Sequence, residues 1–184
     1  MFKTLSIIFC ALLKCVIYLY NANYFMNIFA LDKNPKQASI YHTDKHVVKM
    51  PLETAQMLCT VMSKNNIQSI YKPTHANHPC TIWAGESIEN YFWLCELGIE
   101  LCNEYQFRYK KVHACLDVIV DCIVKAPEIE SKGLISFALA TPIDCKIKNN
   151  PVECYHEYYN KYKSHLFSWK QRHTPYFINQ ISNI

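Results

Sequence analysis

Residues 39–60 read SIYHTDKHVVKMPLETAQMLCT. On a helix of about 3.6 residues per turn, the polar side chains of this stretch fall in one narrow stripe, opposite most of the apolar ones. The stripe consists of His42, His46, Lys49, Glu53, Gln56 and Thr60. Two imidazoles, an amine and a carboxylate in one line can do chemistry, so we predict a helix that carries a functional site. The alternative is an ordinary solvated helix face.

Pro51 lies inside this predicted helix. A proline in a helix interior lacks the N–H that would bond to the preceding turn, and its ring clashes with that turn. We therefore expect the helix to kink or to restart at Pro51. Either outcome changes how the half of the stripe with Lys49 and Glu53 lies relative to the half with His42 and His46.

The rest of the chain predicts further helices around this one. With 184 residues, 51% of them hydrophobic, the chain is long enough for one domain with a sizeable core. Residues 86–113 and 116–124 show the helical spacing of apolar side chains, and Asn150 followed by Pro151 is a typical helix start. Residues 27–31 are short and apolar. The sequence thus predicts a mainly α fold, a single compact helical domain with a short N-terminal extended arm or strand.

The first 25 residues differ from the rest. Residues 1–25 form an apolar extension that resembles a signal peptide or a short membrane anchor, although Lys14 interrupts it. The other interpretation is that translation starts at Met26 and that the preceding residues are upstream sequence read in frame. We favour this second interpretation and expect one helical domain over residues 26–184. Secretion or membrane anchoring through residues 5–20 is the alternative, and a membrane is a partner only if this segment is retained.

The ten cysteines favour a reducing compartment. Their spacing shows no CxxC pair and no compact disulfide framework. Cys95 and Cys102, and likewise Cys115 and Cys122, are seven residues apart, which is the repeat of buried helix positions. We therefore predict reduced thiols in the core and no zinc site made of cysteines.

Composition excludes the commonest nucleotide-dependent enzymes. The chain has three glycines and contains neither a Walker-type phosphate loop nor a dinucleotide-binding fingerprint, so we expect no nucleotide cofactor. The formal net charge of +4 is compatible with a polyanionic partner without requiring one. Many of the 13 tyrosines stand beside Lys, Arg or His, an arrangement that suits stacking on bases and contact with phosphates. An AT-rich genome would also enrich Tyr, Asn, Ile and Lys, so DNA is the expected partner on the functional hypothesis given below and not on composition alone.

Several motifs together resemble a family of uncharacterised proteins from phages and large DNA viruses. They are spread from Met26 to about Phe177 and read Asp44-Lys-His-Val-Val-Lys-Met50, Asn77-His-Pro79, Asn90-Tyr91, Trp93-Leu94, Glu104-Tyr105 and Arg108-Tyr109, with Lys111 and His113. The resemblance implies a viral protein that works in the cytoplasm or nucleus of an infected host cell. It implies no particular activity.

A second resemblance is to the pyrimidine-dimer DNA glycosylases of the phage endonuclease V type. Those proteins are small and mainly helical, with a short N-terminal arm and a helix that carries two basic residues four positions apart. Lys45 and Lys49 match the two bases, and Arg108 matches a later turn. His46 departs from the pattern, because that family has its catalytic acid there, although Glu53 offers a carboxylate further along the helix. That family attacks with the N-terminal amine exposed by removal of Met, whereas here Met26 is followed by Asn27, whose size usually prevents that removal.

The first functional hypothesis is a DNA glycosylase or glycosylase/abasic-site lyase that acts in viral DNA repair or modification. Such an enzyme needs a flipped nucleotide, a group that moves a proton, and cations on the flanking phosphates. The predicted catalytic residues are His42, His46, Lys49 and Glu53. The predicted nucleic-acid-binding residues are Lys45, His78, Arg108, Lys111, His113, Lys170 and Arg172.

Two other hypotheses stay open. His42 and His46 are four residues apart, the spacing by which one helix face offers two imidazoles to an ion. This spacing would suit a metal-dependent hydrolase or phosphodiesterase with a divalent metal, completed by Glu53, His75, His78 or His113, whereas the glycosylase hypothesis needs no cofactor. The third hypothesis is a non-catalytic nucleic-acid-binding viral protein that binds through the segment rich in Tyr and Lys after Pro151.

Overall fold

The computed structural model describes residues 26–146 and 150–179. Within these residues the protein contains six α-helices and no β-strand, so the mainly α prediction is confirmed. The helices are α2 (Pro35–Tyr41), α3 (Asp44–Lys64), α4 (Pro79–Ala84), α5 (Ile88–Tyr109), α6 (Leu116–Val124) and α7 (Pro151–Tyr158). The predicted apolar extension, residues 1–25, lies outside the described residues.

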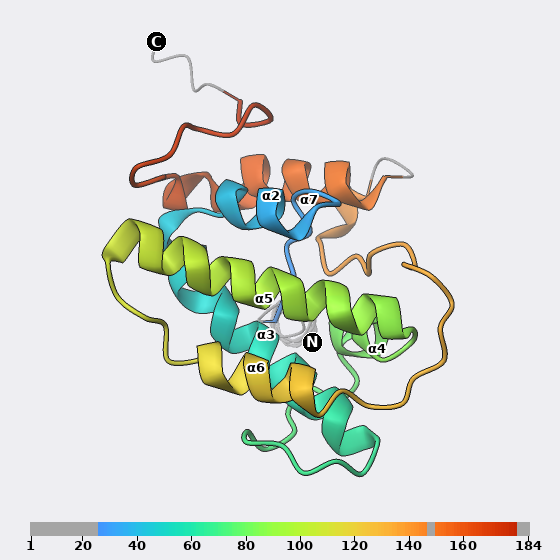
Figure 1. Ribbon diagram of the computed structural model, residues 1–184. Helices are drawn as coiled ribbons and strands as arrows, with labels where there is room; N and C mark the ends of the chain where they lie inside the picture. The colour runs from blue at the N-terminus through green and yellow to red at the C-terminus, as the bar shows by residue number, and fades with distance from the viewer. Residues whose placement is uncertain (1–25, 147–149, 180–184) are drawn as a thin grey trace, which may run out of the picture.

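Helix α5 is the central element of the fold (Figure 1). It packs against α2, α3, α4 and α6, and α3 also contacts α4 and α6. In Figure 1, α2 and α7 lie above α5, and α6 lies below it. The buried side of α5 carries Leu94, Leu97 and Leu101, each at most 1% exposed. The helical spacing predicted for residues 86–113 therefore marks the face that holds the core together.

Gly98 allows three helices to approach one another. A β-carbon at this position of α5 would lie 2.8 Å from Cγ2 of Thr54 on α3. It would also lie 2.9 Å from Cδ1 of Ile119 on α6. Real β-carbons essentially never make contacts this short, so any side chain at Gly98 forces its neighbours to move.

The stretch 39–60 forms parts of two helices, not one. Helix α2 ends at Tyr41 and α3 begins at Asp44, with Thr43 as the cap, whose hydroxyl oxygen accepts a hydrogen bond from the backbone nitrogen of His46 at 3.4 Å. The break between the two helices lies before Asp44, at a place that was not predicted, and α3 continues through Pro51. The expectation of a restart at Pro51 was wrong, because a long helix buried against α5 and α6 can tolerate one missing hydrogen bond, whereas Thr43 supplies a cap that favours a start.

The C-terminal part of the chain changes its helical pitch. Helix α7 starts as predicted, with the Asn150 side chain accepting a hydrogen bond from the backbone nitrogen of Val152 at 3.2 Å. After Tyr158 the chain continues as a π-helical turn, η2 (Tyr159–Lys163), and a 3-10 turn, η3 (Ser164–Leu166). A further 3-10 turn, η1 (Ile143–Cys145), precedes α7. The wider π turn changes which side chains share a face with Tyr158.

The predicted N-terminal arm is present, and it runs through the core. Ile28, Ala30 and Leu31 are fully buried, and none of the described residues of the arm belongs to a strand. Asn27 fixes its course: its side-chain nitrogen donates to the carbonyl oxygen of Ala140 at 2.8 Å. Its side-chain oxygen accepts from the backbone nitrogens of Ile28 and Phe29 at 2.8 and 3.0 Å. The arm is thus a buried element that lies against the site described below.

Eight of the ten cysteines lie within the described residues, and all eight are buried and free. The prediction of reduced core thiols is confirmed for these eight. The closest pair is Cys59 on α3 and Cys122 on α6, whose sulfur atoms are 3.8 Å apart. At this distance the two sulfurs share a hydrogen bond across the helix interface.

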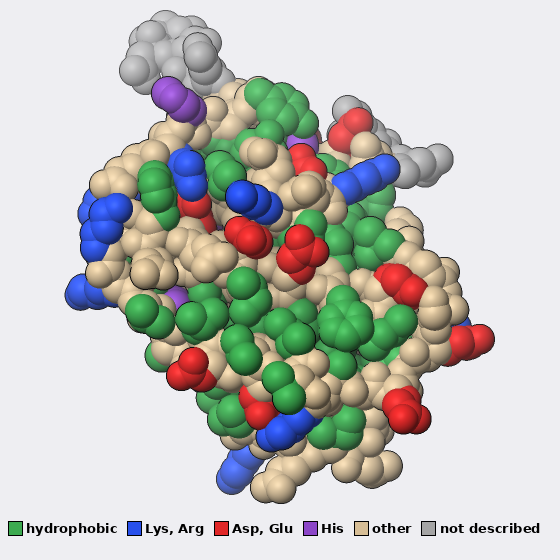
Figure 2. Space-filling model, in the orientation of Figure 1, with side chains coloured by type: hydrophobic (Ala, Val, Ile, Leu, Met, Phe, Trp, Pro, Cys, Tyr) green, Lys and Arg blue, Asp and Glu red, His purple; other side chains and the backbone are tan. Residues whose placement is uncertain are grey.

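The surface combines charged regions with one hydrophobic area. Figure 2 shows hydrophobic side chains gathered over α5 and α6, and exposed residues of these helices include Phe92, Val120, Ile123 and Val124. In the described ranges, 26–146 and 150–179, no helix has both the length and the apolar character needed to cross a membrane.

Candidate active site

A cavity of about 360 Å³ lies between α3, the N-terminal arm and the turns that flank α7. Its walls come from Asn27, Phe29, His46, Lys49, Met50, Glu53, Pro142, Tyr158, Tyr162 and Lys163. Three of these residues, His46, Lys49 and Glu53, belong to the polar stripe predicted from the sequence. This middle part of the stripe therefore lines a cavity that opens at the surface, where 58% of the Lys49 side chain is exposed.

Glu53 is the buried acid of this cavity. It is 5% exposed, and its two carboxylate oxygens have different partners. Oε1 lies 2.8 Å from Nζ of Lys49, and Oε2 accepts a hydrogen bond from the backbone nitrogen of Asn27 at 2.8 Å. Burial raises the pKa of Glu53, and the hydrogen bond and charge of Lys49 only partly offset this. A carboxyl group with a raised pKa can give and take a proton closer to neutral pH.

His46 forms the wall next to Glu53. Its ring stacks on Phe29 with the centroids 4.5 Å apart and an angle of 19° between the planes. Its Nδ1 shares a hydrogen bond of 2.6 Å with the hydroxyl group of Tyr159. Burial, together with the nearby His42, keeps the pKa of His46 well below its ordinary value. The ring is therefore neutral at physiological pH and is held in one orientation.

His42 does not line the cavity, although the sequence placed it in the same stripe. It is the residue that follows α2 as its C-cap, and its ring is fully buried. Its Nδ1 donates to the carbonyl oxygen of Ala38 at 2.7 Å, whereas Nε2 has no partner. Burial lowers the pKa of His42 to about 4. His42 is therefore a neutral core residue, because the chain turns between α2 and α3 and removes it from the face that carries His46.

The predicted pair of metal ligands is not presented by one helix face. The ring centroids of His42 and His46 are 6.2 Å apart, and the break between α2 and α3 separates them. Among the residues that the structure describes, no group of three or more His, Cys, Asp or Glu side chains could hold a metal ion. His78 caps α4 through the backbone nitrogen of Cys80, and Nε2 of His113 donates to the carbonyl oxygen of Val48 at 3.0 Å.

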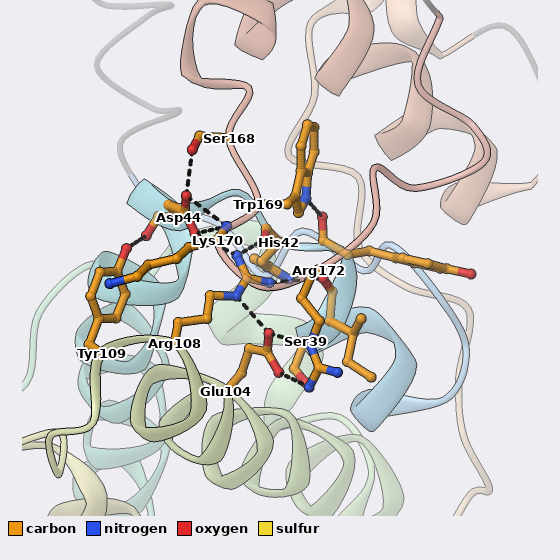
Figure 3. A network of polar contacts seen from close by, with 12 residues as sticks. Ser39, His42, Asp44, Glu104, Arg108, Tyr109, Ser168, Trp169, Lys170 and Arg172 are labelled. Carbon is orange, nitrogen blue, oxygen red and sulfur yellow. Dashed lines mark hydrogen bonds and ion pairs between the residues drawn. The ribbon is translucent and has the colours of Figure 1, made fainter.

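Arg108 binds protein groups in place of the predicted phosphate. It is fully buried, and its Nε lies 2.6 Å from Oε1 of Glu104 (Figure 3). One terminal nitrogen donates to the carbonyl oxygen of His42 at 3.0 Å and to Asp44 at 2.9 Å, and the other donates to the carbonyl oxygen of Ile40 at 3.0 Å. The prediction of a DNA contact was wrong for Arg108, because all its nitrogens are used inside the fold.

The segment after η3 is attached to the same network. Arg172 donates to both carboxylate oxygens of Glu104, at 2.9 and 2.7 Å. Asp44 accepts from the hydroxyl of Ser168 at 2.6 Å and from the backbone nitrogen of Lys170 at 3.0 Å (Figure 3). These bonds connect the junction of α2 and α3, the end of α5 and the C-terminal segment.

The other predicted DNA-binding residues do not line the cavity. Lys45 and Lys111 are exposed, and Nζ of Lys170 lies 5.4 Å from the centroid of the Tyr109 ring. Arg172 lies over the Phe107 ring at 4.0 Å in addition to its bonds to Glu104. Of these residues, Lys45 lies on α3, one residue before His46 of the cavity wall.

The cavity contains residues that the sequence did not single out. Lys163 and Tyr162 reach it from the π-helical turn, Tyr158 from the end of α7, and Asn27 and Phe29 from the arm. Nζ of Lys163 lies 4.9 Å from the centroid of the Tyr158 ring and 5.8 Å from that of Phe29. The repeated Tyr and Lys residues in 155–163 signalled a functional segment. The face that they form depends on the π turn, which the sequence pattern did not indicate.

Comparison with known proteins gave no match to a family model, to a curated protein or to a solved structure.

Proposed function

We propose that this protein is a DNA-acting enzyme of the glycosylase or glycosylase/abasic-site lyase type, and that the cavity at Glu53 is its active site. The observation that carries the proposal is the position of Glu53. Its buried carboxyl group stands at the cavity wall between the amine of Lys49 and the backbone nitrogen of Asn27. A buried carboxyl group beside an amine can give or take the proton that bond cleavage at a sugar carbon needs.

The size and lining of the cavity suit one nucleotide unit taken out of a duplex. Ligand pockets in proteins measure about 300–1,000 Å³, so a cavity of about 360 Å³ takes a small ligand. Phe29 and Tyr158 form apolar parts of the wall, and the charged amine of Lys49 can attract a phosphate. The exposed Lys45 lies on α3, the helix that also carries Lys49, where a flanking phosphate could be bound.

The resemblance to the pyrimidine-dimer glycosylases suggests a catalytic role for the backbone nitrogen of Asn27. In that family the attacking group is the N-terminal amine. The backbone nitrogen of Asn27 lies 2.8 Å from Oε2 of Glu53, so in a chain that begins at Asn27 this nitrogen would be a terminal amine beside the acid. The amines that the cavity offers are therefore Lys49, Lys163 and, in such a chain, that of Asn27.

The test is strand cleavage by the full chain. Duplexes with a pyrimidine dimer, with an abasic site or without a lesion are incubated with the protein, with and without EDTA. We expect cleavage of a lesion duplex that EDTA does not prevent. Glu53→Gln should reduce the rate by about 10²–10⁴-fold, as is typical for loss of a general acid or base, and leave DNA binding intact. Glu96→Gln, at an exposed position of α5, is the control and should keep the rate.

Three results would contradict this proposal. Cleavage that requires a divalent metal and forms no covalent adduct would favour the metal-dependent hydrolase. Binding of DNA with no strand cleavage, even after hot alkali has been used to break any strand from which a base was released, would favour the non-catalytic nucleic-acid-binding protein. Equal rates for the wild type and Glu53→Gln would remove Glu53 from the chemistry.

A further inference from the structure

We infer that Lys163 is the amine with which the cavity binds an aldehyde covalently, as an imine to the open-chain sugar of an abasic site. This inference rests on the proposed function and names the reacting residue and the class of substrate. The sequence placed Lys163 only in a segment rich in Tyr and Lys.

The position of Lys163 separates it from the other lysines. It ends the π-helical turn η2, lines the cavity and is half-buried. Its amine lies over the rings of Tyr158 and Phe29, and within the described residues it forms no ion pair with a carboxylate. Lys49, the other lysine of the cavity, lies 2.8 Å from Glu53 Oε1. The amine of Lys49 is thus engaged by an acid, whereas that of Lys163 points into the cavity without one.

An amine attacks a carbonyl carbon only in its neutral form. Burial, followed by the positive charge of Lys49, lowers the pKa of Lys163, and Glu53 opposes this only in part. The amine is half-buried and poorly hydrated, which is the usual way in which proteins make a lysine nucleophilic, and this outweighs the attraction of the Tyr158 and Phe29 ring faces for its charged form. The position of Lys163 and its lowered pKa therefore both favour it as the reactive amine of the cavity.

Lys161 provides the internal comparison, because it lies on the same turn and differs in its surroundings. It is exposed, and its amine lies 3.1 Å from Glu157 and 3.6 Å from Asp144. The hydrogen bond to Glu157 raises the pKa of Lys161. Lys161 remains charged and outside the cavity, so it should not react.

The covalent step balances with groups of the cavity. The nitrogen of neutral Lys163 forms a bond to the aldehyde carbon, the electron pair of the C=O double bond moves to oxygen, and one proton passes from the nitrogen to that oxygen. The protonated carboxyl group of Glu53 gives its proton to the new hydroxyl group, which leaves as water, and the nitrogen keeps its remaining proton in a protonated imine. The Glu53 carboxylate then takes a proton from the adjacent carbon, the electron pair of that C–H bond forms a C=C double bond, and the phosphate at the next carbon leaves with its bonding electron pair. Water finally adds to the imine carbon and releases Lys163 from the aldehyde product.

The experiment is borohydride trapping with the full chain and an abasic duplex, followed by proteolysis and mass spectrometry of the adduct. We expect the reduced adduct on the peptide that contains Lys163. Lys163→Arg keeps the charge and most of the side chain but cannot form the imine, so it should slow trapping by on the order of 10²-fold. Lys161→Arg should trap at the wild-type rate. Circular dichroism of both variants checks that they are folded.

The outcomes separate this inference from the proposed function. An adduct on Lys49 or on a terminal amine, with unchanged trapping by Lys163→Arg, would overturn the inference and leave the glycosylase/lyase proposal standing. If no duplex is cleaved or trapped, a small phosphorylated aldehyde such as glycolaldehyde phosphate replaces DNA. Preferential reduction onto Lys163 over Lys161 would then support the reactive amine even though the proposed function fails, and equal labelling would reject both.

Discussion

At the scale of single residues, His42 shows how far a helical stripe can mislead. Its neighbours in the stripe, His46, Lys49 and Glu53, lie around one cavity as their spacing predicted. His42 lies in the core because the chain leaves the helical path at Thr43, a residue type that favours helix starts, a signal that our prediction of one helix did not use. The sequence therefore identified three residues of the cavity. The position of the fourth predicted residue, His42, depends on tertiary structure.

The burial of His42 predicts a pH-dependent stability. Its pKa is about 4 in the folded protein and 6.5 in a solvated histidine, so the unfolded chain binds the proton more tightly. The stabilisation is complete above pH 6.5 and is lost as the pH falls from 6.5 through about 4. This group alone accounts for on the order of 3 kcal/mol across that window.

Urea unfolding at several pH values between 7 and 4 measures this effect. In His42→Met the loss of stability over the window should be smaller than in the wild type by on the order of 3 kcal/mol, whatever that substitution costs at pH 7. The buried His46, whose pKa is also lowered, causes part of the loss that remains. His173→Met, at an exposed position, is the matched control and should keep the wild-type pH dependence. An unchanged slope in His42→Met would show that other groups cause it.

At the scale of elements, the sequence predicted where helices occur. It did not predict where a helix is interrupted or changes its pitch. Residues 116–124 form α6 as the apolar spacing indicated, and Asn150 starts α7. The break at Thr43 and the π turn after Tyr158 were missed. Both depend on contacts with distant segments: Asp44 is bonded to Ser168, and Tyr159 to His46. Local propensity contains no information on such contacts.

The contact of three helices at Gly98 predicts a steric effect. Gly98→Val should destabilise the protein by about 1–3 kcal/mol, because the added carbon atoms meet Thr54 and Ile119 at distances that packed side chains do not adopt. Gly85→Ala is the control, since a β-carbon there would have no neighbour closer than 3.5 Å. The measurement is the free energy of unfolding in urea. Equal stability of the two variants would mean that α3 and α6 can move apart freely.

At the scale of the whole molecule, the network around Arg108 holds separate parts of the chain together. It joins the α2–α3 junction, α5 and the segment that contains Lys170 and Arg172. Arg108→Met should destabilise the protein by about 3–5 kcal/mol, because it leaves buried carboxylates without their partner. Arg172→Met should cost about 1 kcal/mol or less, because Arg172 is 30% exposed and Glu104 keeps Arg108.

Thermal or urea unfolding of the two arginine variants decides this prediction. A loss for Arg108→Met no larger than that for Arg172→Met would show that the buried network contributes little. Composition and periodicity predicted the mainly α fold of the molecule, but they could not separate a buried arginine from one that binds phosphate. In the sequence, an arginine of either kind stands at a polar helix end. Only its burial in the structure distinguishes the two.

The arm that runs through the core cannot complete its contacts until late in synthesis of the chain. Asn27 is bonded to Ala140, 113 residues later, and His46 to Tyr159, also 113 residues later. The ribosome adds about 5–20 residues per second, so the arm and α3 wait roughly 6–23 seconds for these partners. During that interval its apolar residues are open to chaperones, and the cavity closes only when nearly the whole described chain has emerged.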